Sequence, residues 1–221
     1  MNRETKYRKT FDKLLEKYRL IKFKRNEVIY QPGDFLDLSY SLKSGFIRIY
    51  TICKSGQEVT IAILKPHSLL PLFFAPNRLK SRYYAETLTP VEAHAISKKE
   101  LISLMVEDPE VFLEIMENIT ELFQGLLARI EYLASGNAYT KVVSVLLSLV
   151  ADSSKRTTEL TLDLPPTHRT IASMTGLTRE TVTLQMLKLK KKGLTSGKGR
   201  RLIIKDIARL REESSCLAEE N

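Results

Sequence analysis

The chain has 221 residues, 43% hydrophobic and 28% charged, a globular composition with room for two domains that excludes an intrinsically disordered chain. No apolar run approaches the roughly 20 residues of a membrane span, and the first residues lack the apolar stretch of a signal peptide, so we expect a cytoplasmic protein with no membrane partner. The two cysteines and three histidines lie in unrelated segments, which argues against a disulfide framework or a metal site, and no cofactor is predicted.

The net charge of +9 is unevenly distributed along the chain. Residues 165–211 carry twelve Lys or Arg against two acids, whereas residues 26–135 carry ten basic and fourteen acidic side chains. A strongly basic C-terminal segment fits a polyanionic partner such as nucleic acid. The alternative is that Lys188 and residues 190–192 only solvate the end of a helix, where cations are favoured in any case. The first 25 residues are also basic, with ten such side chains against three acids.

Residues 26–100 alternate between apolar and polar side chains in short stretches, which is typical of β-strands with one buried face. Turns separate these stretches at Pro32-Gly33-Asp34, Lys43-Ser44-Gly45 and residues 54–57. Many short strands with glycine turns predict a small antiparallel barrel or roll. The clearest strand candidates are residues 46–52, 58–64, 83–88 and 91–96.

A short helix and then a long one are predicted after these strands. Ser97 and Glu100 have the spacing of a capping box, which opens a helix through about Val106. Asp108 is a candidate N-cap and Pro109 a favourable first residue for the long helix, which extends to residue 135. Its acids are interpreted as a solvated face: Glu110, Glu114, Glu117 and Glu121.

The long helix carries two apolar rows, which indicates that it packs on two sides. One row recurs at alternating spacings of four and three residues, an unbroken heptad seam of Phe112, Met116, Ile119, Phe123, Leu126, Ile130 and Leu133. The second row consists of Val111, Ile115, Leu122 and Leu127. We expect one row to pack on the roll and the other to meet the same helix of a second copy, giving a homodimer. The alternative is a monomer in which both rows are core.

Residues 167–189 predict two short helices joined by a tight turn, a helix-turn-helix. Gly176 permits the positive backbone dihedral of the turn, and Thr178 caps the second helix. The inner faces of the two helices are predicted to comprise Ile171, Ala172, Met174, Val182, Met186 and Leu189. The exposed side of the second helix begins with Arg179, Glu180 and Thr181, which suit base edges and phosphates. This segment is therefore predicted to bind duplex DNA.

The helix-turn-helix is flanked by a predicted hinge and a predicted wing. Ser135-Gly136-Asn137 is the hinge, followed by an apolar helix at residues 139–150 and a short strand at residues 160–162. A glycine-rich hairpin at residues 196–201 follows the second helix and leads into a strand at residues 202–204. Such a hairpin is a wing, in which Lys198 and Arg200 are expected to contact phosphate.

Together these features resemble the Crp/Fnr family of bacterial transcription regulators, over nearly everything from Phe23 to Arg209. The resemblance rests on the Pro32-Gly33-Asp34 turn, on Ser44-Gly45 before Phe46-Ile47-Arg48-Ile49, and on Thr89-Pro90-Val91-Glu92. Its most specific part is Leu177-Thr178-Arg179-Glu180-Thr181-Val182. The order of roll, long helix, motif and wing supports it further.

The resemblance implies an α+β fold in three parts. Residues 1–107 would form an antiparallel β-roll similar to a cyclic-nucleotide-binding jelly roll, with the basic N-terminal segment before it. Residues 108–135 would form the dimerisation helix, and residues 136–221 a winged helix-turn-helix. The implied partners are duplex DNA, a second copy of the chain, RNA polymerase and a small-molecule effector of unknown identity.

The family's DNA contacts are implied at the matching positions. Arg179 and Glu180 would read guanine and cytosine edges, because arginine donates two bonds to guanine and a carboxylate accepts from the cytosine amino group. Leu184 stands where a cyclic-AMP-dependent member carries another base-reading arginine, so the site read would differ. The implied phosphate contacts are Thr167, His168, Arg169, Thr178, Thr181, Lys198 and Arg200.

The resemblance weakens at the effector site. Cyclic-AMP-binding members carry Gly-Glu for the ribose and Arg-Ser for the phosphate, where this chain has Pro71-Leu72 and Ser81-Arg82. Together with Leu70 these residues form the candidate effector pocket. Ribose hydroxyls without partners would cost roughly 1–3 kcal/mol each, so cyclic AMP is not expected. Arg82 or Lys80 is interpreted either as an anion ligand or as a solvated charge.

Two other effector classes of the family are also in doubt. Two isolated cysteines cannot supply the thiolates of an iron–sulfur cluster. Residues 84–91 look most similar to cyanobacterial nitrogen-control regulators, which respond to 2-oxoglutarate, but their keto-acid-binding arginine and glutamate fall at Leu122 and Leu127. The expected effector is a molecule other than cyclic AMP, with an apolar or unfamiliar ligand left open, or there is none.

The sequence as a whole predicts a homodimeric, sequence-specific transcription regulator that reads successive major grooves of a palindromic site. One alternative is a nonspecific architectural DNA-binding protein, and another is an effector-sensing module that acts through a protein partner. An enzyme is not expected, because no Ser/His/Asp arrangement, P-loop, metal-ligand spacing or pair of catalytic acids is apparent.

Overall fold

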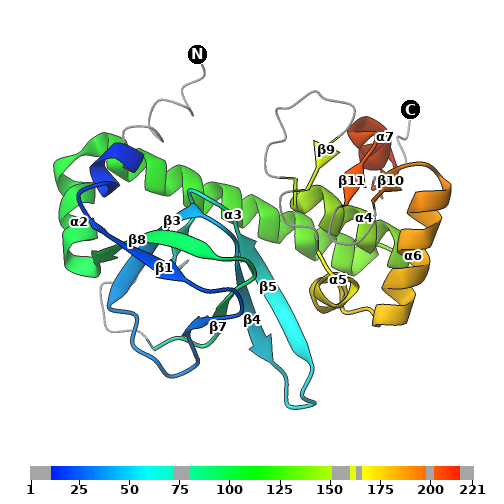
Figure 1. Cartoon of the computed structure of the whole chain (residues 1–221), viewed down its shortest axis with the longest axis horizontal. Coiled ribbons are helices and arrows are strands. Elements are labelled where there is room, and N and C mark those ends of the chain that lie inside the picture. Colours follow the sequence, from blue (N-terminus) through cyan, green and yellow to red (C-terminus); the bar gives the residue numbers. More distant parts are fainter. Residues whose placement is uncertain (1–10, 72–79, 151–159, 163–165, 198–201, 215–221) are drawn as a thin grey trace. The chain divides into compact units, whose positions relative to one another are not determined.

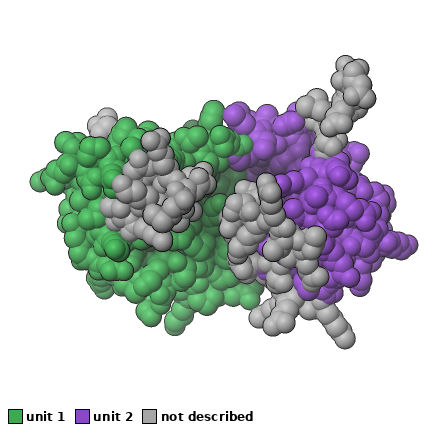
Figure 2. All heavy atoms as spheres, turned by 90° about the horizontal axis from the view of Figure 1, so that it is seen from above, with its two compact units in different colours: residues 1–51, 61–124 green, residues 52–60, 125–221 purple. Residues whose placement is uncertain are grey.

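The computed structural model describes residues 11–71, 80–150, 160–162, 166–197 and 202–214. The chain divides into two compact units (Figure 1), which Figure 2 distinguishes by colour. The first takes in residues 1–51 and 61–124, and the second takes in residues 52–60 and 125–221.

The first unit is built on two four-stranded antiparallel sheets, as the alternating sequence predicts. One sheet has the order β1 (Arg19–Phe23), β8 (Val91–Ser97), β3 (Leu38–Ser44) and β6 (Leu69–Leu70). The other has the order β2 (Val28–Tyr30), β7 (Tyr84–Thr87), β4 (Ile47–Ile52) and β5 (Glu58–Leu64), and the β4–β5 turn belongs to the second unit. All four strand candidates of the sequence are confirmed within one or two residues at each end.

Strand β1 lies in the basic N-terminal segment, to which the sequence assigned no structure. It pairs with β8 in the register Ile21↔Ala93 and Lys22↔Glu92. The Lys22 ammonium lies 2.7 Å from the Glu92 carboxylate, so the charge of Lys22 is matched across the pair. Before it, residues 11–15 are helical and bury Phe11 and Leu15. Part of the basic segment is therefore structural.

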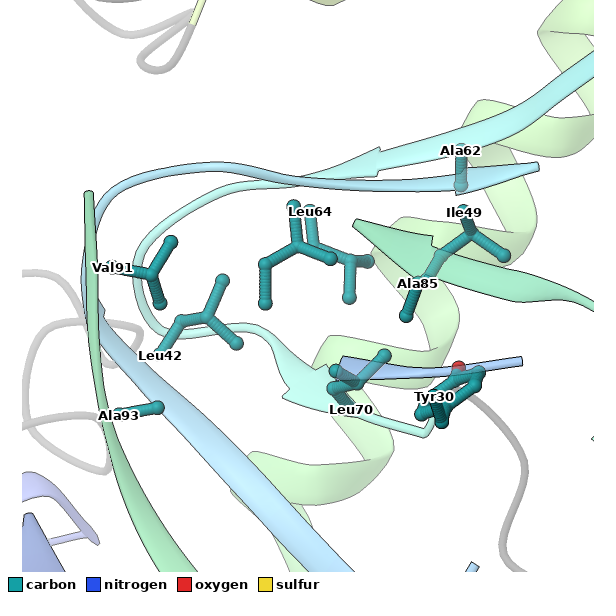
Figure 3. Packing of buried hydrophobic residues seen from close by; sticks show 10 residues of the cluster. Tyr30, Leu42, Ile49, Ala62, Leu64, Leu70, Ala85, Val91 and Ala93 are labelled. Atoms are coloured by element: carbon teal, nitrogen blue, oxygen red, sulfur yellow. The ribbon is translucent and has the colours of Figure 1, made fainter. Parts of the chain in front are cut away.

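The core of the first unit lies between the two sheets and is apolar (Figure 3). It consists of Tyr30, Leu42, Ile47, Ile49, Ala62, Leu64, Leu70, Ala85, Val91 and Ala93. The predicted turn at Gly45 is essential to this packing: φ is +87°, and a Cβ there would lie 2.3 Å from the Pro90 carbonyl oxygen. Only glycine fits that position without moving the backbone.

Two helices follow the strands at the predicted places: α2 (Lys98–Glu107) and α3 (Pro109–Ser135). The capping box is confirmed, since Ser97 Oγ accepts a bond from Glu100 N (3.2 Å) and the Glu100 carboxylate accepts one from Ser97 N (3.2 Å). Asp108 Oδ1 accepts a bond from Glu110 N (2.9 Å) and so caps α3. Residues 109–124 of α3 belong to the first unit and residues 125–135 to the second.

Besides residues 125–135 of α3, the second unit contains four helices and a small antiparallel sheet among its described residues. The helices are α4 (Ala138–Ser148), α5 (His168–Thr175), α6 (Arg179–Lys191) and α7 (Ile207–Glu212). The sheet has the order β10 (Thr195–Ser196), β11 (Ile203–Ile204) and β9 (Leu160–Thr161). Its core includes Val142, Leu146, Ile171, Leu189, Leu194 and Leu210, all fully buried. The sequence did not predict helix α7. Asp206 caps its N-terminal end, and its buried side chains are Ile207 and Leu210.

The predicted hinge lies between α3 and α4. A Cβ on Gly136 would lie 2.5 Å from the Tyr132 carbonyl oxygen, so a larger residue requires the chain to shift. Asn137 Oδ1 then accepts bonds from Tyr139 N (2.9 Å) and Thr140 N (3.1 Å) and starts α4. Among the described residues no helix is long and apolar enough to cross a membrane.

Candidate nucleic-acid interface

The turn between α5 and α6 is built by the residues that the sequence indicates. Thr167 Oγ1 accepts a bond from Thr170 N (3.1 Å) and caps α5. Gly176 ends α5 with φ +70°, and its N–H bonds to the Ala172 carbonyl (2.9 Å). Thr178 then caps α6 by accepting a bond from Thr181 N (3.2 Å). Capping and the left-handed glycine therefore fix the angle between the helices.

The predicted inner faces are confirmed except at one position. The buried members are Ile171, Ala172, Met174, Val182 and Leu189. Met186 is only half-buried, and Gln185 is buried instead, at 8% exposed. The prediction for Met186 is wrong: both Gln185 and Met186 share a helix face with Val182 and Leu189, and the structure buries Gln185. Polarity therefore does not decide which of the two lies inside.

The N-terminal end of α6 presents the two predicted base-reading residues. Arg179 and Glu180 are exposed, and neither forms an ion pair with a residue that the structure describes. The same helix ends with Lys188, Lys190 and Lys191 in its last turn. The first amide groups of a helix carry a partial positive charge, which adds to that of Arg179. This face therefore suits an anionic partner with acceptor groups.

Five of the predicted phosphate contacts lie at the N-terminal ends of α5 and α6. Thr167 and Thr178 are the caps, and Thr181 Oγ1 lies 2.9 Å from Thr178 Oγ1. The Arg169 side chain is 81% exposed, with Nη2 3.7 Å from a Glu58 carboxylate oxygen. His168 opens α5 and is half-buried. Lys198 and Arg200 lie outside the described residues.

His168 also connects the two helices. Its Nδ1 lies 2.8 Å from Thr183 Oγ1, and that hydroxyl donates to the Arg179 carbonyl (2.8 Å). The Thr183 hydroxyl has one proton and uses it to donate a hydrogen bond to the Arg179 carbonyl, so the His168 tautomer that carries a proton on Nδ1 completes both bonds. This tautomer leaves Nε2 for a further partner.

Helix α3 exposes most of its predicted heptad seam. Phe112 is 42%, Ile119 38%, Phe123 59% and Ile130 64% exposed, and Leu126 and Leu133 are half-buried. Met116 is the exception, because it packs partly against the cluster of Phe11, Leu15, Leu69, Ile96, Leu101, Val111 and Ile115.

The second row of α3 is only partly internal. Val111 and Ile115 are buried and Leu122 packs on the core of the roll, but Leu127 is 50% exposed, so the row is covered only over its first three members. Glu114 corrects the solvated-face prediction: it is 1% exposed, and its Oε1 accepts a bond from Asn118 Nδ2 (3.1 Å). It lies on the same side of the helix as Val111 and Ile115, which explains its burial.

The residues of the candidate effector pocket have different surroundings. Leu70 is part of the apolar core, and Pro71 is buried. The Ser81 hydroxyl donates to the Tyr83 carbonyl (2.7 Å) and accepts from Tyr83 N (3.1 Å), while Arg82 is exposed. Leu72 lies outside the described residues. The pocket stays a prediction.

A polar cluster on the β4–β7 pair was missed by the sequence reasoning. Arg48 Nη2 lies 2.8 Å from Glu86 Oε2, and both side chains are largely buried. The Arg48 guanidinium lies 4.0 Å from the centre of the Tyr50 ring, on which Tyr84 stacks at 5.0 Å. The register pairs Arg48 with Glu86 and Tyr50 with Tyr84. The sequence signal for this cluster is weak: Arg48 and Tyr50 occupy alternate positions of one strand candidate, and Tyr84 and Glu86 those of another.

Two family models match the chain. A cyclic nucleotide-binding domain matches residues 20–108, and a Crp-like helix-turn-helix domain matches residues 140–213. Together they account for well over half of the chain. The first lies on the β-sheets with α2, and the second on helices α4–α7 with the small sheet.

Individual proteins agree with both models. The chain is 29% identical to the global nitrogen regulator of a Nostoc species over 177 residues, and this aligned stretch covers 79% of each protein. Its fold matches that of FixK2 from Bradyrhizobium japonicum with a TM-score of 0.77 at 19% identity, covering 91% of this chain and 99% of FixK2. A CooA variant from Carboxydothermus hydrogenoformans gives a TM-score of 0.73 at 24% identity, with 92% and 90% covered. By its two matched domains the chain belongs to the Crp/Fnr family of transcription regulators.

Proposed function

We propose that the protein is a homodimeric, sequence-specific regulator that reads a palindromic DNA site through Arg179 and Glu180. The observation that carries the proposal is the exposure of both side chains, unpaired within the described residues, at the capped N-terminal end of α6. Recognition helices of this class insert that end into the major groove. Arginine then bonds to guanine, and the carboxylate accepts from cytosine.

The proposed homodimer is supported by the apolar face that α3 leaves exposed. Phe112, Ile119, Phe123 and Ile130 lie on this face at heptad spacing, and a monomer would expose them to water. Pairing two such helices buries that area and sets two α6 helices to read half-sites about 34 Å apart. The symmetry of the dimer would then require a palindrome.

The proposed effector is a molecule other than cyclic AMP, or there is none. The Ser81 hydroxyl already bonds to the Tyr83 backbone, and Leu70 is packed in the core, so neither offers a free polar group for a sugar phosphate. We further propose that the bound dimer contacts RNA polymerase. Because a bacterial chromosome lies in the cytoplasm, this role places the protein there.

The decisive experiment selects bound sequences from a random duplex pool with the full-length protein. A palindrome with half-sites one helical turn apart supports the proposal. About eight phosphate contacts per dimer predict that log K falls with log salt concentration at a slope near −7. Enrichment of no sequence, or equal competition by random duplex, would instead favour the nonspecific architectural protein. No binding to any duplex would favour action through a protein partner.

A further inference from the structure

Helix α6 exposes two leucines on the face that begins with Glu180. Leu184 is 59% exposed and Leu187 49%, whereas Val182 and Leu189 of the same helix are fully buried. Residues four apart in a helix share a face, so Leu184 lies directly behind Glu180. The core of the unit does not use this leucine, and its apolar surface is available for a partner.

The partner of this face is indicated by its neighbours. The last turn of α6 carries Lys188, Lys190 and Lys191, and Arg179 lies at the start of the helix. A protein partner for this apolar patch would meet four positive charges beside the carboxylate of Glu180. A duplex provides phosphates for the positive charges and a base amino group for the carboxylate. The occupant that fits both the charge and the apolar centre is the major groove of DNA.

One base presents an apolar group in that groove, the C5-methyl of thymine. A leucine side chain has no donor or acceptor, so against a G·C pair it would cover polar edge groups without replacing their bonds to water. Four residues of α6 rise about 6 Å, which is less than two base-pair steps of about 3.4 Å. Leu184 therefore reaches a base pair adjacent to, or one beyond, the pair that Glu180 contacts.

We propose that Leu184 determines specificity by packing against the methyl group of a thymine, which fixes an A·T pair within two steps of the pairs read by Arg179 and Glu180. The inference rests on the proposed function and deepens it. Leu184 is preferred to Leu187 because base contacts are made near the N-terminal end of a recognition helix.

The test replaces each thymine of the selected palindrome by deoxyuridine, which lacks only the methyl group. At one symmetric pair of positions the substitution should weaken binding about fourfold for each methyl removed, and about fifteenfold when both half-sites are changed. Leu184→Ala should lose this sensitivity and keep its preference at the guanine read by Arg179. Leu187→Ala is the matched control and should keep both. Both positions are exposed, and equal melting temperatures will show that the variants fold.

Several results would overturn the assignment of Leu184. The first is that wild-type protein binds equally well with deoxyuridine at every position. The second is that binding by Leu184→Ala is still weakened by deoxyuridine as much as that of the wild type. The third is that Leu187→Ala, and not Leu184→Ala, loses this sensitivity to deoxyuridine. A selected palindrome with no thymine within two steps of the guanine would overturn it as well. Failure of the proposed function is a separate result, since no palindrome would then be selected at all.

Discussion

The imidazole Nδ1 of His168 lies 2.8 Å from the hydroxyl of Thr183, so a hydrogen bond joins the first turn of α5 to the middle of α6. This bond orients the ring at the place where a phosphate contact is proposed. Thr183→Val keeps the shape of the side chain and removes the hydroxyl. We expect the free energy of unfolding to fall by about 1 kcal/mol and binding to weaken on every operator alike, measured by denaturation and by fluorescence anisotropy.

Thr120→Val is the control for this change. The Thr120 hydroxyl donates to the Met116 carbonyl four residues before it, as that of Thr183 does to Arg179. Both variants lose a bond within their own helix, but only the Thr183 variant also loses the bond between helices. Equal effects of the two substitutions on DNA binding would contradict the role given to His168.

Arg179→Ala should relax sequence preference and not merely lower affinity. Loss of two bonds to guanine is expected to cost roughly 1–3 kcal/mol at one base pair of each half-site. Arg169→Ala removes a charge from an exposed side chain at the start of α5 and should weaken all sequences similarly, with a smaller salt slope. Competition titrations against operators that carry single base changes will separate these patterns. Arg179→Ala with unchanged discrimination at every position would contradict the base contact.

The elements of the fold could be predicted because their signals are local. Gly45 marks a turn that only glycine fits, and Ser97 with Glu100 marks the start of a helix within four residues. Pairing between distant strands has no such signal. The Arg48–Glu86 ion pair joins residues 38 positions apart. Strand β1 lies among basic residues, and of these Lys22 pairs with Glu92 across the sheet.

The elements of the candidate site could be predicted from the sequence, but the burial of individual side chains could be predicted less well. The period of α3 predicts two apolar rows, but the limit of the roll decides that Leu122 is covered and Leu127 is not. Polarity also misleads at Glu114 and Gln185, which are buried. Residue type therefore predicts a side chain's environment only where neighbouring elements are already known.

Phe123→Asp should dissociate the proposed dimer, because it places a charge in the centre of the exposed seam, where Phe123 is 59% exposed in the single chain. Analytical ultracentrifugation is expected to change from a dimer to a monomer of 25.3 kDa, and operator binding should weaken strongly. Gln124→Asp adds the same charge at the next exposed position and should leave both unchanged. Wild-type protein that sediments as a monomer at the concentrations used for DNA binding would contradict the dimer.

The C-terminal helix is held to α6 by an ion pair that predicts a pH dependence of stability. Lys192 Nζ lies 2.7 and 2.8 Å from the two carboxylate oxygens of Glu213 and 4.8 Å from the centre of the Tyr139 ring. The hydrogen bond that Lys192 donates lowers the pKa of Glu213 below its ordinary 4.5, and the acceptance of that bond by the Glu213 carboxylate raises the pKa of Lys192 above 10.5. Both groups are therefore charged and paired throughout the neutral range.

The sign of the effect follows from these directions. Because the pKa of Glu213 is lower in the folded state, its contribution is complete above pH 4.5 and is lost as the pH falls through the folded value. The contribution of Lys192 is complete below 10.5 and is lost above its raised pKa. Glu213→Gln should thus lower the melting temperature slightly at pH 7, since solvent screens this pair, and the difference from wild type should shrink towards pH 3. A difference between Glu213→Gln and wild type that stays constant from pH 7 to pH 3 would show that the ion pair does not hold α7 in place.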